Sequence, residues 1–572
     1  MNNVIFLILR RMRAPLLVLI GAYAISIGGL VLIPGVDDAG NPWRFDFFHA
    51  FYLITYTAST IGYGEIPYAF TGAQRLWVTL SIYLTVIGWL YAIGTLLALL
   101  QDPVFKRALT EQRFARAVRH IKVPFYLICG YGETGALLVR ALTRRDVQSV
   151  VIDSDPERLN HIALEDFSFD IPHLCADARQ SRHLLEGGLR HPRCIGVVAI
   201  TNDDETNVKI AIVTKVLNPG LKVICRATTQ DVAANLKSFN TDHVINPFNI
   251  FAVHLAITLR APSVHLLHDW LISVPNHPLH PPVKPPRGPY ILMGYGRFGK
   301  AVKKHLEYEG VPTRIIEPHA EECAQETGAI IGPGTEAVTQ REAGIDKAVA
   351  IVAGTDSDAN NLSIIMTARD LNPDLYLIAR QNRRSNDDIF QAAGLDMIMQ
   401  GSRIIVWRIL PLLTAPLLSR FLHLARHHHE EWAGEVVDRV RAVCRGVTPR
   451  TWAVEIGPEQ APAVHAALEA GLDVRLWHLL REPHDRDQTL LCVPLIRVCG
   501  KEEILLPEPA GQLQSGDRLL FCAHSDVAGR MAWTLVNKNV LEYIVTGEER
   551  PDGYIWRWLA RRRARAAPSQ ST

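Results

Sequence analysis

Two glycine-rich segments decide the fold of most of this chain: Gly130-Tyr131-Gly132-Glu133-Thr134-Gly135 and Gly294-Tyr295-Gly296-Arg297-Phe298-Gly299. Each follows a short apolar segment, 123–129 or 290–293, and each precedes a stretch with a helical pattern. A second apolar segment then ends at an acidic residue, Asp153 in the first case and Glu317 in the second. This order of strand, glycine turn, helix and strand is typical of a dinucleotide-binding unit.

Each residue type in this pattern has a physical reason. The glycines (Gly130, Gly132 and Gly135; Gly294, Gly296 and Gly299) permit a tight turn and a close approach of backbone to phosphate, which the helix N-terminus attracts. Asp153 and Glu317 can bind ribose hydroxyls and disfavour a 2′-phosphate, which favours NAD or adenosine nucleotides. Arg297 can neutralise a pyrophosphate, whereas Glu133 would repel one, so the second site is the stronger prediction.

The two segments belong to one duplicated module. Matching elements recur 164 residues apart and later, after a shortening of ten residues, 154 apart, as in Asn207 and Asn361 or Arg226 and Arg380. We therefore expect two tandem Rossmann-like α/β domains, 123–274 and 290–425, joined by a Pro-rich linker, 275–289. Arg226 and Arg380 follow strands at the ligand-facing edge, where they can reach phosphate or pair with surface acids.

Each copy ends in an apolar helical pair, 248–272 and 404–424. These faces are too apolar to stay exposed, so we expect them to pack against another module, with packing inside their own copy as the alternative. A small α+β subdomain, 426–530, and a tail, 531–572, complete the expected organisation.

The composition limits the class of protein. With 572 residues, 48% hydrophobic and 21% charged, the chain is long enough for several domains and resembles a soluble protein, so any membrane part is a minor fraction. The net charge of +2 suggests no nucleic-acid partner. Nine cysteines without a CxxC pair suit reduced thiols that face a cytosol.

Two uncharged stretches, 14–33 and 76–100, are long enough to cross a bilayer. A cleaved signal peptide is the alternative for the first, but its apolar region is too long. Basic residues precede the first stretch and follow the second, while the loop between them holds only Arg44 and Arg75. The positive-inside rule therefore places both ends in the cytoplasm of a multi-pass protein of the cell (inner) membrane.

Between these spans lies the pentapeptide Thr60-Ile61-Gly62-Tyr63-Gly64. It matches the potassium-filter sequence TVGYG with Ile in place of Val, and its glycines allow successive carbonyls to face one axis. Residues 46–58 form an expected short helix that leads into it, and Glu65 adds a carboxylate at the outer mouth. We therefore expect a two-span pore domain over 1–101, with pore helix and filter over 46–65.

Gly88 and Gly94 interrupt the otherwise bulky second span. A glycine there permits either a bend of the inner helix or close helix packing, and the sequence leaves both glycines as hinge candidates.

With these motifs in place, the chain resembles two-transmembrane potassium channels gated by cytoplasmic RCK domains, in the variety with two RCK units per subunit. The resemblance covers residues 14 to about 525 and includes Gly516-Asp517, similar to a turn of the RCK C-terminal subdomain. It implies a homotetramer without enzymatic activity, in which eight RCK units form a gating ring beneath the pore. The linker 102–122 would pass changes in that ring to the inner helix.

The identity of the regulatory ligand stays open. Nucleotides are the leading class, and an unoccupied Rossmann scaffold is the alternative. The acid-x-acid calcium site of related channels is replaced by Arg226-Ala227-Thr228 and Arg380-Gln381-Asn382, which leaves Asp203, Asp204 and Glu205 as weak candidates for Ca²⁺. The run His427-His428-His429 suits a metal or, more simply, a charged connector, and the basic segment 561–565 suits anionic lipid or a disordered tail.

A different class of function remains as the rival hypothesis. The chain could be a membrane-anchored NAD-binding regulatory subunit or an oxidoreductase without a pore of its own. An oxidoreductase would need a proton-transfer residue and a substrate domain, and no such constellation is recognisable in the sequence.

Overall fold

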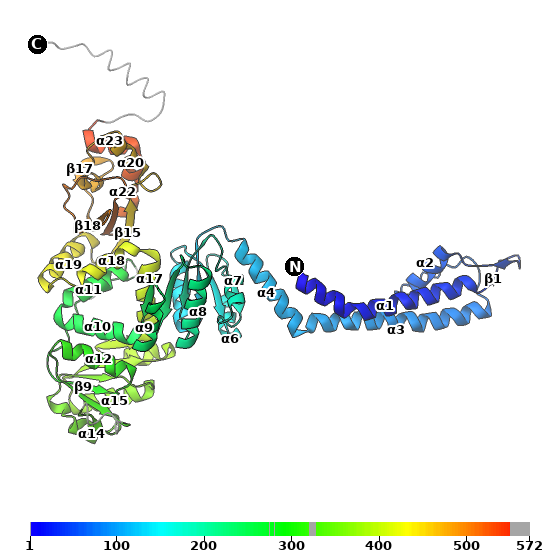
Figure 1. Ribbon diagram of the computed structural model, residues 1–572, viewed down its shortest axis with the longest axis horizontal. Helices are drawn as coiled ribbons and strands as arrows, with labels where there is room; N and C mark the ends of the chain where they lie inside the picture. The colour runs from blue at the N-terminus through cyan, green and yellow to red at the C-terminus, as the bar shows by residue number, and fades with distance from the viewer. Residues whose placement is uncertain (1, 274, 280, 320–327, 549–572) are drawn as a thin grey trace, which may run out of the picture. The chain divides into compact units, whose positions relative to one another are not determined.

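The computed structural model describes residues 2–273, 275–279, 281–319 and 328–548. The N-terminal part consists of two long helices that lie side by side, α1 (Asn2–Leu32) and α3 (Gly72–Gln101), with the short helix α2 (Phe47–Ala58) against both (Figure 1). A small antiparallel hairpin precedes α2. Its strands, β1 (Gly35–Val36) and β2 (Pro42–Trp43), have two residues each. The helical segments Arg10–Leu32 and Gly72–Gln101 are each long and apolar enough to cross a membrane.

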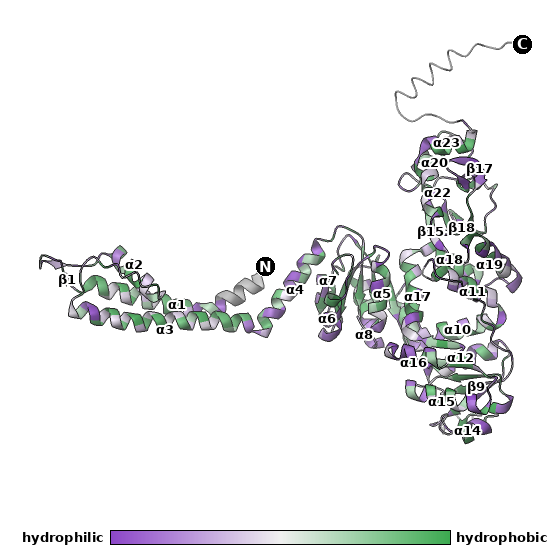
Figure 2. Ribbon diagram, turned by 180° about the vertical axis from the view of Figure 1, so that it is seen from behind, coloured by the Kyte–Doolittle hydropathy of each residue, from purple (hydrophilic) through white to green (hydrophobic). Residues whose placement is uncertain are grey.

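Close packing holds α1 and α3 together. Trp77 of α3 covers Gly29 of α1 so tightly that a Cβ at Gly29 would come 2.0 Å from the indole ring, and the Trp77 Nε1 donates to the Ser26 carbonyl over 3.0 Å. Much of the remaining surface of both helices is apolar (Figure 2) and exposed, for example at Leu17 and Leu90. Such faces require lipid or other subunits to cover them.

Helix α4 (Pro103–Arg119) occupies the expected linker. Asp102 caps it by accepting a hydrogen bond from the Val104 amide over 2.8 Å, and the same carboxylate pairs with Arg11 of α1 at 2.8 Å. The linker between the second span and the first sheet is therefore a helix with an ordered start rather than a flexible chain.

The first α/β domain is built on a six-stranded sheet with the order β5-β4-β3-β6-β7-β8. The strands are β3 (Phe125–Cys129), β4 (Gln148–Asp153), β5 (His173–Cys175), β6 (Cys194–Ala199), β7 (Lys222–Arg226) and β8 (His243–Ile245). The accompanying helices are α5 (Glu133–Thr143), α6 (Pro156–Leu164), α7 (Ser181–Glu186), α8 (Asp204–Leu217) and α9 (Gln230–Ser238). The strand β3 is buried at every residue, as expected for a central parallel strand.

The second α/β domain repeats this topology, with the parallel order β11-β10-β9-β12-β13-β14. Its strands are β9 (Tyr290–Met293), β10 (Thr313–Glu317), β11 (Ile330–Ile331), β12 (Ala350–Ala353), β13 (Tyr376–Gln381) and β14 (Met397–Gln400). Its helices are α12 (Arg297–Tyr308), α14 (Ala337–Glu342), α15 (Asp358–Leu371) and α16 (Asp387–Ala392), with short 3-10 turns at Ile345–Lys347 and Arg384–Asn386. The prediction of two tandem Rossmann-like units is confirmed.

The first helix of each apolar pair packs against the other copy, in agreement with the prediction that these pairs pack against another module. In the first pair, α10 (Pro247–Arg260) and α11 (Pro262–Ile272), the α10 residues Phe248 and Phe251 share a core with Tyr290 and Phe298 of the second copy. In the second pair, α17 (Gly401–Thr414) and α18 (Pro416–Ala425), α17 packs against α5 of the first copy. Helices α10 and α17 therefore join the two copies, whereas α11 and α18 share a core with α19 and the sheet of the C-terminal subdomain.

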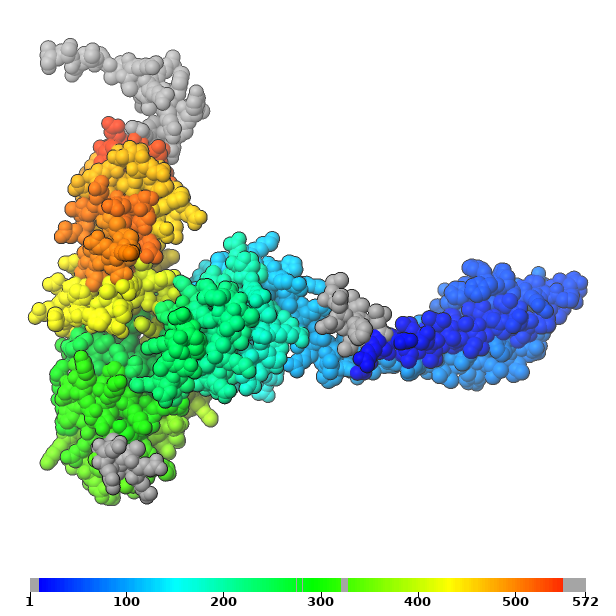
Figure 3. Space-filling view, viewed as in Figure 1, coloured from blue at the N-terminus to red at the C-terminus, as the bar shows by residue number. Residues whose placement is uncertain are grey.

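The C-terminal subdomain begins with α19 (Glu430–Cys444) and has an antiparallel sheet in the order β15-β20-β18-β19. Its strands are β15 (Arg450–Glu455), β18 (Cys492–Cys499), β19 (Glu502–Leu505) and β20 (Arg518–Ala523), beside the hairpin β16 (Arg481–Glu482) and β17 (Asp485–Thr489). Its other helices are α20 (Pro462–Glu469), α21 (Leu476–Leu479), α22 (Val527–Val536) and α23 (Lys538–Thr546). In Figure 3 the subdomain, in orange, lies directly against the yellow helices around α18 and α19, with which it shares a core.

One boundary differs in detail from the expectation. Met531 and Leu541 of α22 and α23 are buried in the core of the subdomain, so its folded part reaches Thr546 rather than ending at 530. The Pro-rich linker contacts the C-terminal subdomain, because the His277 amide donates to the Thr448 hydroxyl over 3.0 Å. The basic segment 561–565 lies outside the described residues.

Candidate functional site

The filter segment has the backbone that a row of inward carbonyls needs. Thr60, Gly62 and Gly64 have φ values of +61°, +63° and +73°, while Ile61 and Tyr63 between them have negative φ. This alternation turns successive carbonyls to the same side, which an ordinary strand cannot do. The amides of Ile61 and Gly62 both donate to the Tyr56 carbonyl at the end of α2, over 3.0 and 3.2 Å, and so anchor the segment to that helix.

Tyrosines and Glu65 hold the outer end of the filter segment. The Tyr56 hydroxyl donates to the Glu65 carbonyl and the Tyr52 hydroxyl donates to the Glu65 carboxylate, each over 2.9 Å. The Tyr63 ring lies edge-on to the Tyr56 ring, with 6.0 Å between centroids. Glu65, expected as a cation-attracting carboxylate at the mouth, is thus also a brace for the loop, a role that sequence reasoning missed.

The two hinge candidates differ in their surroundings. Gly88 is buried, and a Cβ there would lie 3.5 Å from the Leu19 side chain and 3.7 Å from the Ala22 side chain of α1. Gly94 has no atom within 4 Å of such a Cβ, and α3 continues through both positions without a break. Close packing accounts for Gly88, and Gly94 is left as the position where a bend meets no neighbour.

Both glycine loops have a geometry that only glycine permits. Gly130 and Gly294 have φ values of +104° and +93°, and a Cβ at Gly135 or Gly299 would come 2.1 or 2.0 Å from the carbonyl oxygen of the loop's first glycine. Helices α5 and α12 begin here with Gly132 and Gly296 as their N-cap residues, and neither helix has a side-chain cap. Both N-termini can therefore receive an anion.

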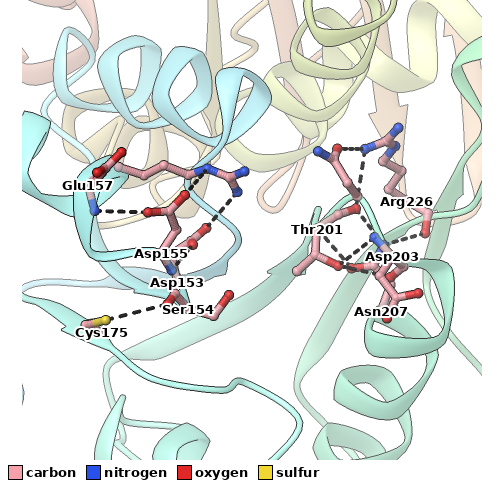
Figure 4. Close-up of polar contacts among 11 residues, drawn as sticks. Asp153, Ser154, Asp155, Glu157, Cys175, Thr201, Asp203, Asn207 and Arg226 are labelled. Atoms are coloured by element: carbon pink, nitrogen blue, oxygen red, sulfur yellow. Dashed lines mark hydrogen bonds and ion pairs between the residues drawn. The ribbon is translucent and has the colours of Figure 1, made fainter. Parts of the chain in front are cut away.

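The acids at the strand ends are held differently in the two copies. Asp153, at the end of β4, accepts from the Asp155 amide over 2.8 Å and lies 3.8 Å from the Arg158 guanidinium (Figure 4). Glu317, at the end of β10, accepts from the Tyr295 amide over 2.6 Å. Glu317 is thus bonded to its own glycine loop, so a ribose would share this carboxylate with the backbone.

An asparagine in each copy holds the end of the strand that carries Arg226 in the first copy and Arg380 in the second. The Asn207 Oδ1 accepts from the Thr201 amide over 3.0 Å and its Nδ2 donates to the Arg226 carbonyl over 3.2 Å (Figure 4). Asn361 makes the same pair of bonds, from the Thr355 amide over 2.9 Å and to the Arg380 carbonyl over 2.7 Å. The repeat in the sequence pointed to these residues, but their common role emerges only here.

Arg226, Arg297 and Arg380 converge in a partly buried region between the two copies. Arg297 and Arg380 lie over the Phe248 ring of α10, with their guanidinium carbons 5.6 and 4.9 Å from its centroid. Burial is the main cause that lowers the pKa of Arg226, and the charges of Arg297 and Arg380 lower it further. Burial likewise lowers the pKa of Arg380, although the Asp356 carboxylate at 2.6 Å opposes this effect.

The first helical residue of each glycine loop contacts the opposite copy. The Arg297 Nη1 donates to the Thr228 hydroxyl, just after β7 of the first copy, over 2.8 Å. The Arg384 amide, just after β13 of the second copy, donates to the Glu133 carboxylate over 3.1 Å. The residue that departs from the phosphate-binding pattern, Glu133, thus has a partner of its own, which the sequence could not reveal.

The weak metal candidates are engaged in local structure. The Asp203 carboxylate accepts from the Thr206 amide over 3.0 Å and caps α8, and Asp204 accepts from the Thr228 amide over 2.9 Å. His428 stacks on Trp432 with 4.3 Å between ring centroids. Within 2–273, 275–279, 281–319 and 328–548, no group of three or more His, Cys, Asp or Glu residues is arranged to hold a metal ion.

Comparison with known proteins agrees with this division of the chain. A family model described as an ion channel matches residues 16–102, and the TrkA-N domain model matches residues 126–247 and 290–401. Potassium channel protein 1 of Methanocaldococcus jannaschii is 27% identical over 228 residues, which are 39% of this chain and 66% of that protein. The voltage-gated potassium channel Kch of Escherichia coli is 22% identical over 242 residues, 42% of this chain and 55% of that protein.

The matched region thus spans about two thirds or less of these relatives' own length. Among solved structures, the GsuK channel bound to NAD aligns over 93% of this chain and all of that chain, with 15% identity and a TM-score of 0.46. GsuK bound to ADP aligns over 72% of this chain and 99% of that chain, with 19% identity and a TM-score of 0.43. The chain therefore carries an ion-channel domain followed by two TrkA-N domains, and it is similar in sequence to an archaeal potassium channel.

Proposed function

We propose that this chain is the subunit of a potassium channel whose pore is gated by nucleotide binding to its TrkA-N domains. The observation that carries the proposal is the segment from Thr60 to Gly64, with alternating φ signs, held by a short helix between two helices long enough to span a membrane. Potassium coordination by backbone carbonyls needs this arrangement. The names of the sequence relatives, which are potassium channels, support the same conclusion.

A potassium filter is built from four such loops around one axis, and each chain supplies one loop. The active form in this proposal is therefore a homotetramer. Ile61 and Tyr63 are 59% and 64% exposed in the single chain, which supports the presence of further subunits around the axis. Four chains bring eight TrkA-N domains, which we place in the cytoplasm as a ring below a pore in the cell (inner) membrane. The helix α4 then links each ring segment to α3.

Nucleotide gating rests on the second glycine loop in particular. A pyrophosphate at the N-terminus of α12 would attract Arg297, whose guanidinium otherwise bonds Thr228 of the first copy. Occupancy of this site would therefore change a contact between the two copies, and a ligand can shift a conformational equilibrium only through such a difference. NAD and the adenosine nucleotides are the ligand class we propose, with Ca²⁺ left as a second possibility to be tested.

The pore is tested by reconstitution into liposomes. We expect the purified protein to pass K⁺ but not Na⁺ and to be blocked by Ba²⁺, whereas Gly62→Ala should be silent because alanine is strained at a φ of +63°. Equal Na⁺ flux would contradict a potassium filter. No flux under any nucleotide would favour the alternative of a membrane-anchored regulatory subunit without a pore.

The regulatory site is tested with a matched pair of loop variants. A Cβ at Gly296 meets open space, so Gly296→Asp should fold while its carboxylate repels phosphate at the second loop, and Gly132→Asp makes the same change at the first. We expect Gly296→Asp to abolish the response of open probability to NAD⁺, NADH, ADP or ATP, and Gly132→Asp to leave most of it. An unchanged dose response in Gly296→Asp would remove the second loop from the mechanism.

A further inference from the structure

A cavity of about 500 Å³ lies among the two helical pairs. Its lining includes no residue of either glycine loop. Its walls come from α9, from α10 and α11 of the first copy, and from α17 and α18 of the second. One set of lining side chains is apolar and includes Ile250, Val253, Ile257, Val264 and Leu422. A volume of this size is typical of sites for small organic ligands.

The polar side chains of the lining are lysine, arginine, histidine and the neutral amides asparagine and glutamine. The lining contains Lys237, His254, His265, His268, Arg408, His423 and Arg426, and no aspartate or glutamate is among the lining residues. A cavity that combines apolar walls with cationic groups favours an anion that also has an apolar body.

Arg408 of α17 is the strongest sign of a missing anion. Its side chain has no hydrogen bond or ion pair to any of the residues that the structure describes. Burial lowers the pKa of Arg408, and the charge of Arg426 lowers it further, so this guanidinium is held in an unfavourable setting. A guanidinium presents five N–H donors, and a half-buried one without acceptors is stabilised most by a bound carboxylate or phosphate.

Three histidines line the same cavity as Arg408. The His254 ring of α10 lies 4.6 Å from the His268 ring and 5.8 Å from the His265 ring of α11, between centroids. The Asp269 carboxylate lies against this group, 3.5 Å from His265 Nδ1 and 3.8 Å from His268 Nδ1. The His268 Nδ1 is buried and has no hydrogen-bond partner among the described residues.

Burial disfavours the protonated form of two of these histidines, His254 and His265. Burial lowers the pKa of His254 well below its usual range, the His268, His265 and Arg408 charges lower it further, and Asp269 opposes them. Burial also lowers the pKa of His265, with Asp269 again opposing and His268 adding. An anion beside these rings would raise their affinity for protons, so binding and protonation are linked.

We propose that this cavity binds a small organic anion with an apolar body, such as a medium-chain carboxylate, whose head pairs with Arg408 and the histidines. Its body lies against Ile250, Val253 and Leu422. Because the walls come from both copies, the ligand braces the exchanged helical pairs against each other. A consequence for gating rests on the proposed channel function, whereas binding itself does not.

Octanoate binding to the purified full-length protein in detergent, followed by isothermal titration calorimetry, tests the proposal. We expect saturable binding of one octanoate per chain. Octylammonium, which lacks the negative charge, and inorganic phosphate, which lacks the alkyl chain, should each bind at least about tenfold more weakly. Absence of octanoate binding, or equal binding of octylammonium, would overturn the anion site. Equal binding of inorganic phosphate would overturn the apolar half of the assignment.

Variants separate this cavity from other surfaces. Arg408→Met should weaken octanoate binding about tenfold or more, whereas Arg439→Met, an exposed arginine of α19, should leave it unchanged. Val253→Phe, which fills the cavity without touching a charge, should also abolish binding and serves if Arg408→Met fails to fold. Affinity should increase as the pH falls toward and below the ordinary histidine pKa of about 6.5, because burial lowers the pKa of His254 and His265 in the ligand-free protein and a bound anion favours their protonated forms. Equal affinity in both arginine variants, or a flat pH profile, would contradict the roles given to these residues.

Discussion

Thr228→Val should tighten nucleotide binding to the second glycine loop. In the structure the Arg297 guanidinium donates to the Thr228 hydroxyl over 2.8 Å, so a nucleotide that recruits Arg297 must first break this bond. A hydrogen bond to a charged group contributes a net stability of about 1.5 to 3 kcal/mol, so its removal should lower the Kd by about tenfold to 150-fold. Valine has nearly the shape of threonine. The Thr228 amide keeps its bond to Asp204, whereas the second bond to that carboxylate, which the Thr228 hydroxyl donates over 2.7 Å, is lost together with the bond from Arg297.

The assay is calorimetric titration of NAD⁺ or ADP into a background of Gly132→Asp, so that the second loop dominates the signal. Thr228→Ser, which keeps the hydroxyl, is the matched control and should bind as the parent does. In Arg297→Met, the further change Thr228→Val should not alter the Kd for the nucleotide, because the guanidinium for which the phosphate and the Thr228 hydroxyl compete is gone. Weaker binding in Thr228→Val, or the same gain in the Arg297→Met background, would refute the competition between phosphate and Thr228.

Three further predictions concern stability and gating. Gly29→Val should separate α1 from α3, because a Cβ there would come 2.0 Å from the Trp77 ring, and thermal denaturation monitored by size-exclusion chromatography should show a lower Tm. Gly94→Ala should favour the straight inner helix by about 1 kcal/mol and reduce open probability in single-channel recordings. Arg497→Met should destabilise the C-terminal subdomain by about 3 to 5 kcal/mol, because it leaves Asp517 without the partner 2.6 Å away, and limited proteolysis should detect the change.

Each of these predictions has a matched comparison within the chain. A Cβ at Gly28 meets no atom within 4 Å, so Gly28→Ala should leave the Tm of the helix pair unchanged. Gly88→Ala, whose Cβ would make ordinary contacts with α1, should affect packing more than opening. Replacing Arg497 and Asp517 together by leucine should recover much of the stability lost in Arg497→Met, since no unpaired charge remains. Equal effects within a pair would contradict the corresponding explanation.

Much of the fold was predictable because its key positions leave a local signature. Gly135 and Gly299 must be glycine since a Cβ would meet a carbonyl oxygen of the same loop, and the contact spans only five residues. The excess of apolar residues in the two helical pairs predicted that they pack against another module, whereas the exchange between the two copies emerges only from the structure. The end of the C-terminal subdomain was less clear, because α22 and α23 bury only a few side chains against distant strands.

The partners of charged side chains were not predictable. Arg297 and Thr228 lie 69 residues apart, and Glu133 and Arg384 lie 251 apart, in different copies of the module. Glu317 looks from the sequence like a ribose ligand, yet its carboxylate bonds the Tyr295 amide. No spacing rule connects such pairs, because the packing of two whole domains brings them together.

Residue types and their near neighbours are enough to specify the backbone of the filter segment, of the two membrane-length helices and of the doubled glycine loops. Which charges meet depends on the packing of distant segments, as for Arg297 and Arg380 over the Phe248 ring, and for Arg408, which has no ion pair among the described residues. The two kinds of property differ in the length of chain that sets them. A positive φ or an apolar run is a property of a few consecutive residues, whereas the environment of a long cationic side chain is set by every segment that packs around it.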